Sequence, residues 1–193
     1  MTVPILQKED KILRKKSEEV PVGDIALPKI HKIIADMKEA MHGEPDAVAI
    51  AAPQIGVNLR IFVVAGRAFN IMKKESVKSK VESKSENKKD EKMPEDQIFI
   101  NPKITKLSKE TKSMEEGCLS VRYLYGKVRR STKATVEAYN EKGEKIKRGG
   151  SGLLAQIFQH ETDHLEGKLF IDKATDVIDL PPKEREEWKK KNR

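Results

Sequence analysis

Residues 153–165 read LLAQIFQHETDHL and predict an amphipathic helix. The apolar residues recur at the spacing of one helical stripe, namely Leu153, Leu154, Ile157, Phe158 and Leu165. His160, Glu161 and His164 fall on or beside that stripe. Two imidazoles one helical turn apart can chelate a single metal ion, and the Glu after the first His can act as a general base. The stretch therefore predicts a metal site, for which the rest of the chain must supply a third ligand.

The composition favours one small domain with a charged surface. The chain has 193 residues, of which 37% are hydrophobic, 36% charged and only 5% aromatic, so we expect a single domain with an aliphatic core. The single cysteine excludes an internal disulfide and is typical of a reducing compartment. No uninterrupted apolar run follows the first charges, so neither a signal peptide nor a membrane anchor is indicated. We expect a cytoplasmic protein.

The net charge of +8 raises the question of contact with nucleic acid or another anionic assembly. Lys and Glu alternate through much of the chain, aromatic residues are too few for base stacking, and no recognition motif is present. A solvated charged surface is therefore favoured over direct, sequence-specific nucleic-acid binding.

The first half of the chain predicts one helix and one buried strand before a change of composition. Residues 27–41 have the apolar spacing of an amphipathic helix, with Pro28 near its start. Residues 47–56, AVAIAAPQIG, are small and apolar, and residues 60–66, RIFVVAG, predict a strand. Residues 72–96 contain almost nothing to bury, so we expect a flexible charged insertion between two strands of one sheet rather than a domain boundary.

The second half predicts short strands and then the helix with the two histidines. A turn is expected at residues 140–143, and Gly149-Gly150 is expected to break the sheet, with Ser151 as the helix N-cap. Residues 181–193 are expected to form a short charged tail, held by Trp188. Strands and helices do not alternate regularly, so we predict an α+β fold with antiparallel or mixed sheets around a central metal-binding helix.

Cys118, in the sequence EEGCLS at residues 115–120, is the first candidate for the third ligand. Taken alone, it is more typical of a small buried residue. A tetrahedral site with two histidines accepts a thiolate, and Cys118 is the only thiol in the chain. The competing histidines are His31 and His42. A metallopeptidase would instead use a ligand after the helix, where the acidic candidates are Glu166 and Asp172.

Three motifs in this order resemble the signature motifs of the peptide deformylase family. They are AVAIAAPQIG at 47–56, EEGCLS at 115–120 and QHETDHLEG at 159–167. The similarity runs from ILRKKSEEV at 12–20 to LFIDK at 169–173, apart from the insertion. The resemblance implies a metal-dependent hydrolase that removes the N-formyl group from the N-terminal methionine of newly made polypeptides and releases formate.

The resemblance also implies roles for individual residues. Cys118, His160 and His164 would hold one divalent metal ion, Fe2+ natively, with Zn2+ or Ni2+ as substitutes. Glu161 would be the general base, and the Gln54 side chain and the Leu119 backbone N–H would stabilise the oxyanion. The residues expected to bind substrate are Val48, Ala49, Ile50 and Gly117.

The chain departs from the family pattern at two places. Ala47 and Ala49 stand where the family usually has glycines; a methyl at Ala49 narrows the cleft and costs roughly 1 kcal/mol if φ is positive there. Residues 122–125, RYLY, replace the usual segment that begins with proline.

The expected partners are N-formylmethionyl nascent peptides, with no membrane. The ribosome surface is a further candidate partner, contacted through the basic residues 183–193. Two alternatives are an ordinary metallopeptidase and a non-catalytic, metal-stabilised module that binds the ribosome or RNA.

Overall fold

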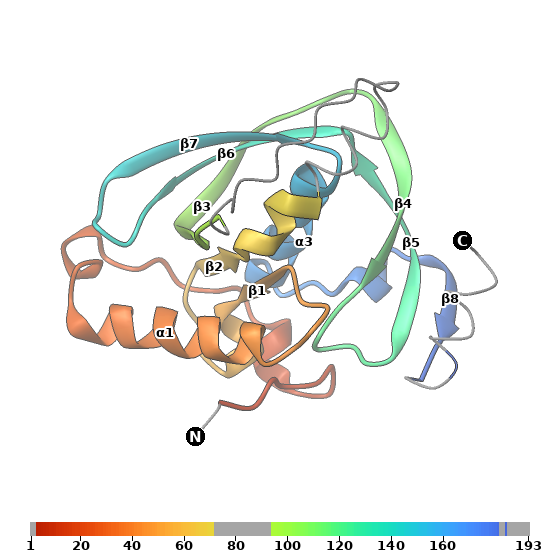
Figure 1. Cartoon of the computed structure of the whole chain (residues 1–193), viewed down its shortest axis with the longest axis horizontal. Coiled ribbons are helices and arrows are strands. Elements are labelled where there is room, and N and C mark those ends of the chain that lie inside the picture. The colour runs from red at the N-terminus through yellow and green to blue at the C-terminus, as the bar shows by residue number, and fades with distance from the viewer. Residues whose placement is uncertain (1–2, 72–93, 182–183, 185–193) are drawn as a thin grey trace, which may run out of the picture.

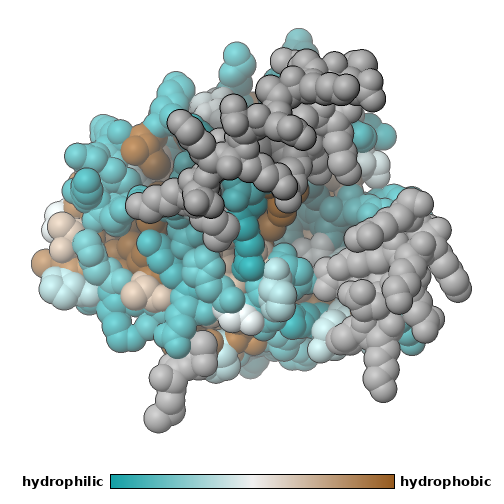
Figure 2. Space-filling view, viewed as in Figure 1, coloured by the Kyte–Doolittle hydropathy of each residue, from teal (hydrophilic) through white to brown (hydrophobic). Residues whose placement is uncertain are grey.

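The computed structural model describes residues 3–71, 94–181 and 184. Most of the predicted insertion at 72–96 and of the predicted tail at 181–193, including Trp188, lies outside these residues. Within the described ranges, no helix is both long enough and apolar enough to cross a membrane. Figure 2 shows a mostly hydrophilic face with small, separate hydrophobic patches, in line with the charged composition.

In the described residues, eight strands form two antiparallel sheets (Figure 1). The five-stranded sheet has the order β1-β2-β3-β6-β7, with bounds Ala49–Ala51, Ile61–Val64, Gln97–Leu107, Lys133–Tyr139 and Lys145–Ser151. The three-stranded sheet has the order β4-β5-β8, with bounds Thr111–Gly117, Leu124–Ser131 and Thr175–Asp179. The predicted α+β class with antiparallel sheets is confirmed.

Helix α1, Pro28–His42, forms where the apolar spacing predicts it. Proline at the start of the helix lacks only an N–H that would have no partner there. The side chains on its apolar face are buried: Ile30, Ile34, Met37, Ala40 and Met41. The predicted strand at 60–66 is shorter than expected, because β2 ends at Val64 and residues 66–71 are helical. The part of the chain that the structure describes also has short 3-10 helices at Lys11–Arg14, Val22–Asp24, Ala52–Ile55 and Phe170–Asp172.

Helix α3, Leu153–Leu165, has the predicted bounds and contacts strands of both sheets (Figure 1). It lies against all five strands of the larger sheet and against β5 of the smaller one. Its apolar face is anchored by Phe158, whose ring centroid lies 5.3 Å from that of Phe99 and 6.3 Å from that of Phe62. This packing holds α3 on the five-stranded sheet.

The predicted sheet break at Gly149-Gly150 is wrong. Both glycines belong to β7, where they pair with Thr135 and Ala134 of β6. A Cβ at Gly150 would lie 2.7 Å from Cγ of Leu154, so glycine there lets the first turn of α3 pack on the strand. The predicted N-cap is also wrong, because Ser151 ends β7 and the N-cap is Gly152, with φ 53° and ψ −128°. That backbone conformation favours glycine over serine.

Candidate metal centre

Three potential metal ligands meet between the end of β4 and helix α3. Cys118 directly follows β4, and His160 and His164 lie one turn apart on α3. One ligand atom from each of the three residues lies within 4.8 Å of the others, and Cys118 Sγ is 3.2 Å from His164 Nε2. His164 is buried and the other two are half-buried. In the described part of the chain, this is the one such group of three metal-binding side chains.

The competing ligands lie elsewhere with partners of their own. His31 Nε2 is 3.1 Å from the carbonyl oxygen of Glu141, and His42 Nε2 is 2.8 Å from a carboxylate oxygen of Asp96. Glu166 accepts a 2.7 Å hydrogen bond from Arg60. Asp172 likewise accepts one of 2.6 Å, from Arg14. None of the four belongs to the group of three.

A buried ionic network supports His160 and was not anticipated from the sequence. His160 Nδ1 lies 2.9 Å from Glu116 Oε2. Arg130 donates to both oxygens of Glu116, at 2.8 and 3.0 Å, and to Asp163 at 2.6 Å. Burial alone would raise the pKa of Glu116, but the hydrogen bonds with His160 and Arg130 outweigh it and lower the pKa to about 2. The ionised carboxylate engages Nδ1 and leaves Nε2 of His160 as the nitrogen for a metal.

Glu161 is buried on α3 and lines the same cleft as Cys118 and His160. Its Oε2 atom has no hydrogen-bond partner within the described residues. Burial raises the pKa of this carboxyl to about 7. Such a buried carboxylate oxygen needs a polar partner. Its place beside one thiol and two imidazoles fits a site that receives a divalent ion and a polar substrate.

Gln54 reaches the metal-ligand group from the short helix that follows β1. Its Oε1 accepts a 2.8 Å bond from the N–H of Ala51, which fixes the orientation of the amide. Its Nε2 donates to Ser120 Oγ at 3.1 Å and lies 3.5 Å from Cys118 Sγ. Leu119, the next residue after Cys118, is half-buried and lines the cleft. Gln54 and Leu119, the two residues predicted to supply the oxyanion donors, thus line the same cavity.

The cleft has a volume of about 750 Å³, and Val48, Ala49 and Gly117 line it as predicted. Ile50 is instead fully buried in the core and is not among the residues that line the cleft. Ala49 pairs with Val64 in β1 and does not have a positive φ. The strain considered for an alanine at this position is therefore absent.

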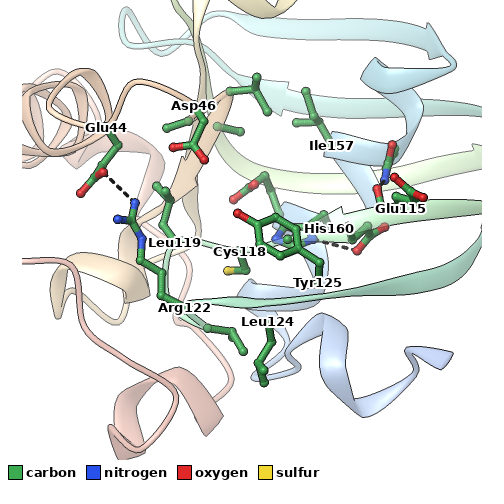
Figure 3. Close-up of a pocket in the computed structure, with 18 of the residues that line it drawn as sticks. Glu44, Asp46, Glu115, Cys118, Leu119, Arg122, Leu124, Tyr125, Ile157 and His160 are labelled. Atoms are coloured by element: carbon green, nitrogen blue, oxygen red, sulfur yellow. Dashed lines mark hydrogen bonds and ion pairs between the residues drawn. The ribbon is translucent and has the colours of Figure 1, made fainter. Parts of the chain in front are cut away.

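The segment after Cys118 forms one side of the cleft. Arg122 Nη2 lies 2.7 Å from Glu44 Oε2, so an ion pair joins this segment to the loop before β1 (Figure 3). Tyr125 packs on Gly117, where a Cβ would lie 2.5 Å from Cε1 of the tyrosine ring. Glycine at 117 thus allows the ring to lie close to the backbone next to Cys118.

Comparison with known proteins identifies the family of this chain. The family described as polypeptide deformylase matches residues 2–178. Peptide deformylase 2 of Clostridium acetobutylicum is 41% identical over 170 residues, which cover 88% of this chain and 93% of that protein. The chain belongs to the peptide deformylase family. Peptide deformylases are metal-dependent hydrolases, and this one removes the formyl group from N-terminal formylmethionine of new polypeptides and releases formate.

Solved peptide deformylases share the fold. The enzyme of Legionella pneumophila has a TM-score of 0.70 and 33% identity, with coverage of 99% of this chain and 93% of that one. A class I type b peptide deformylase of Acinetobacter baumannii with Met-Ala-Ser bound has a TM-score of 0.72 and 27% identity. The match covers 90% of this chain and 98% of that one. Membership of this family favours deformylation over the metallopeptidase and non-catalytic alternatives.

Proposed function

We propose that Cys118, His160 and His164 hold one divalent ion, with Fe2+ as the native metal and Zn2+ or Ni2+ as substitutes. One thiolate and two imidazoles suit all three metals. The closeness of the three ligand atoms supports this assignment. When bound, the ion would supply Lewis acidity, which lowers the pKa of a water molecule and polarises a carbonyl group.

Glu161 is assigned as general base and then general acid. Its unpartnered Oε2 takes the proton of the attacking water and returns it to the nitrogen of the leaving methionine amine. A carboxyl whose pKa is raised to about 7 by burial can both accept and donate a proton near neutral pH.

Gln54 and Leu119 are assigned as oxyanion donors. Nε2 of Gln54 and the backbone N–H of Leu119 would both donate to the oxygen of the formyl group as negative charge develops there. Val48, Ala49 and Gly117, which line the cleft, are proposed to bind the peptide that follows the formyl group. A Met-Ala-Ser peptide bound to the Acinetobacter relative supports peptide binding in this fold.

Residues 1–193 are assigned to one deformylase-like domain in which α3 is the central element, because both sheets contact it. The substrates are nascent chains in the cytoplasm. The basic residues 183–193 are proposed to contact the ribosome surface, since their charge suits an anionic assembly.

The observation that carries the mechanism is the buried, unpartnered carboxylate oxygen of Glu161 beside the metal ligands. Formate release from formyl-Met-Ala-Ser should fall about 100-fold or more in Glu161→Gln, while the bound metal measured by elemental analysis stays at one per chain. Chelation should abolish release, and anaerobic reloading with Fe2+, Ni2+ or Zn2+ should identify the native metal. Near-normal activity in Glu161→Gln would contradict the assignment, and equal cleavage of unformylated Met-Ala-Ser would favour a metallopeptidase.

A further inference from the structure

The N-terminal segment at residues 5–7 contacts both chain segments that carry the proposed oxyanion donors. The backbone N–H of Leu6 donates to the carbonyl oxygen of Gln54 at 2.8 Å. The side-chain Nε2 of Gln7 donates to the carbonyl oxygen of Leu119 at 3.0 Å. Gln7 and Leu119 are 112 positions apart in the sequence, so this contact exists only in the folded chain. Two adjacent residues, Leu6 and Gln7, thus connect two segments that must cooperate in the site.

Both the nitrogen and the oxygen of the Gln7 side-chain amide form hydrogen bonds. Besides Leu119, its Nε2 donates to the carbonyl oxygen of Ile5 at 3.3 Å. Its Oε1 accepts a longer bond, of 3.4 Å, from the backbone N–H of Arg122. The one side chain therefore holds residues 119 and 122 at the two ends of the turn that follows Cys118. A proline at position 122 could not donate the second of these bonds.

The side chains next to Gln7 are anchored independently of it. Ile5 packs against the core cluster that contains α1 and β2 residues. Leu6 packs against a separate cluster around Leu13 and Phe170. These apolar contacts fix the path of the segment, whereas Gln7 itself is exposed. Truncation of Gln7 should therefore remove its polar contacts and leave the segment in place.

We infer that Gln7 is a positioning residue for the oxyanion site. By holding the Leu119 backbone at a set distance from the segment of Gln54, it aims both donors at one oxygen atom. Oxyanion donors act only when they lie about 2.7–3.1 Å from the developing charge, so small displacements of one donor weaken stabilisation of the transition state. The inference rests on the proposed roles of Gln54 and Leu119.

Gln7→Ala tests the inference in the metal-loaded enzyme with formyl-Met-Ala-Ser. We expect kcat to fall about three- to tenfold, because a misplaced oxyanion donor is weakened in the transition state and not removed. KM, metal content and the midpoint of thermal unfolding should stay at their wild-type values. Gln7→Glu should not recover activity, because its carboxylate faces the Leu119 carbonyl without a donor. Lys8→Ala, a change at the neighbouring exposed residue, is the matched control.

A double-mutant cycle with Gln54→Ala separates this inference from the function on which it rests. If Gln7 aligns the two donors, its truncation should cost less in the Gln54→Ala background, where one donor is already missing. Equal effects in both backgrounds, a rise in KM alone, or a lower unfolding midpoint would overturn the positioning role. If Gln54→Ala lowers kcat while Gln7→Ala behaves like Lys8→Ala, only the inference fails. If Gln54→Ala leaves kcat unchanged, the proposed oxyanion role itself fails.

Discussion

Replacing Glu116 by alanine should destabilise the metal-free protein by about 3–5 kcal/mol, the range for removal of one partner of a buried ion pair. The Glu116 and Arg130 side chains are only 2% and 5% exposed. Glu116 accepts two bonds from Arg130 and engages His160 Nδ1. After truncation, the Arg130 guanidinium keeps only its hydrogen bond to Asp163, and it is too deeply buried to be solvated instead. For a chain of this length, that loss lowers the unfolding midpoint by about 6–20 °C.

Urea unfolding in the presence of a chelator measures this loss without a contribution from metal. Glu115→Ala is the matched control, because Glu115 is the exposed neighbour on the same strand and its change should stay within about 0.5 kcal/mol. Metal affinity should also fall about 10- to 100-fold in Glu116→Ala, since His160 loses the group that orients its ring. An unfolding free energy within about 0.5 kcal/mol of wild type, or the same loss in the Glu115 control, would refute this account of the network.

Three further changes test other parts of the structure. Gly117→Ala should lower the rate of formate release and reduce the free energy of unfolding in urea by about 1–3 kcal/mol, because the new methyl overlaps the Tyr125 ring. Unchanged values of both would contradict this contact. Phe158→Ala should reduce the free energy of unfolding in urea by about 3–5 kcal/mol, because removal of the fully buried ring leaves a cavity. A reduction below about 1 kcal/mol would argue against this packing. Burial would raise the pKa of Asp172, but hydrogen bonds from Arg14 and the Leu169 N–H lower the pKa below its usual value. The ionised carboxylate therefore stabilises the folded protein above about pH 4, and this contribution is lost as the pH falls. Asp172→Asn should therefore reduce the acid dependence of the unfolding free energy, measured from pH 6 to pH 2, and an unchanged pH profile would count against the ion pair.

The two long helices could be predicted from sequence because their stability depends on apolar spacing. Both α1 and α3 have bounds within one residue of the prediction. The three-residue group of Cys118, His160 and His164 could be predicted only through the need for a third ligand and the resemblance to a family. Residues 66–71 were missed as helical because these six residues carry too little periodicity to distinguish them from the end of a strand.

Two glycines and one glutamate account for the main differences between the predictions from sequence and the structure. Gly149 and Gly150 were interpreted as breakers, but tertiary packing of Leu154 against the strand selects a residue without a side chain. Glu116 was quoted in the second motif without a role, since its partner Arg130 is placed by pairing of β4 with β5. One signal was available: Glu116 lies two residues before Cys118, and alternation along a strand puts both side chains on the same face.

The division of the metal ligands between two sheets has a consequence for local unfolding. Cys118 follows a strand of the three-stranded sheet, whereas His160 and His164 belong to a helix packed mainly on the five-stranded one. Any opening that separates these two units destroys the site before either unit unfolds. A bound ion therefore acts as a non-covalent cross-link, and its loss should increase hydrogen exchange at β4, β5 and α3 together while the β1–β2 pair stays protected.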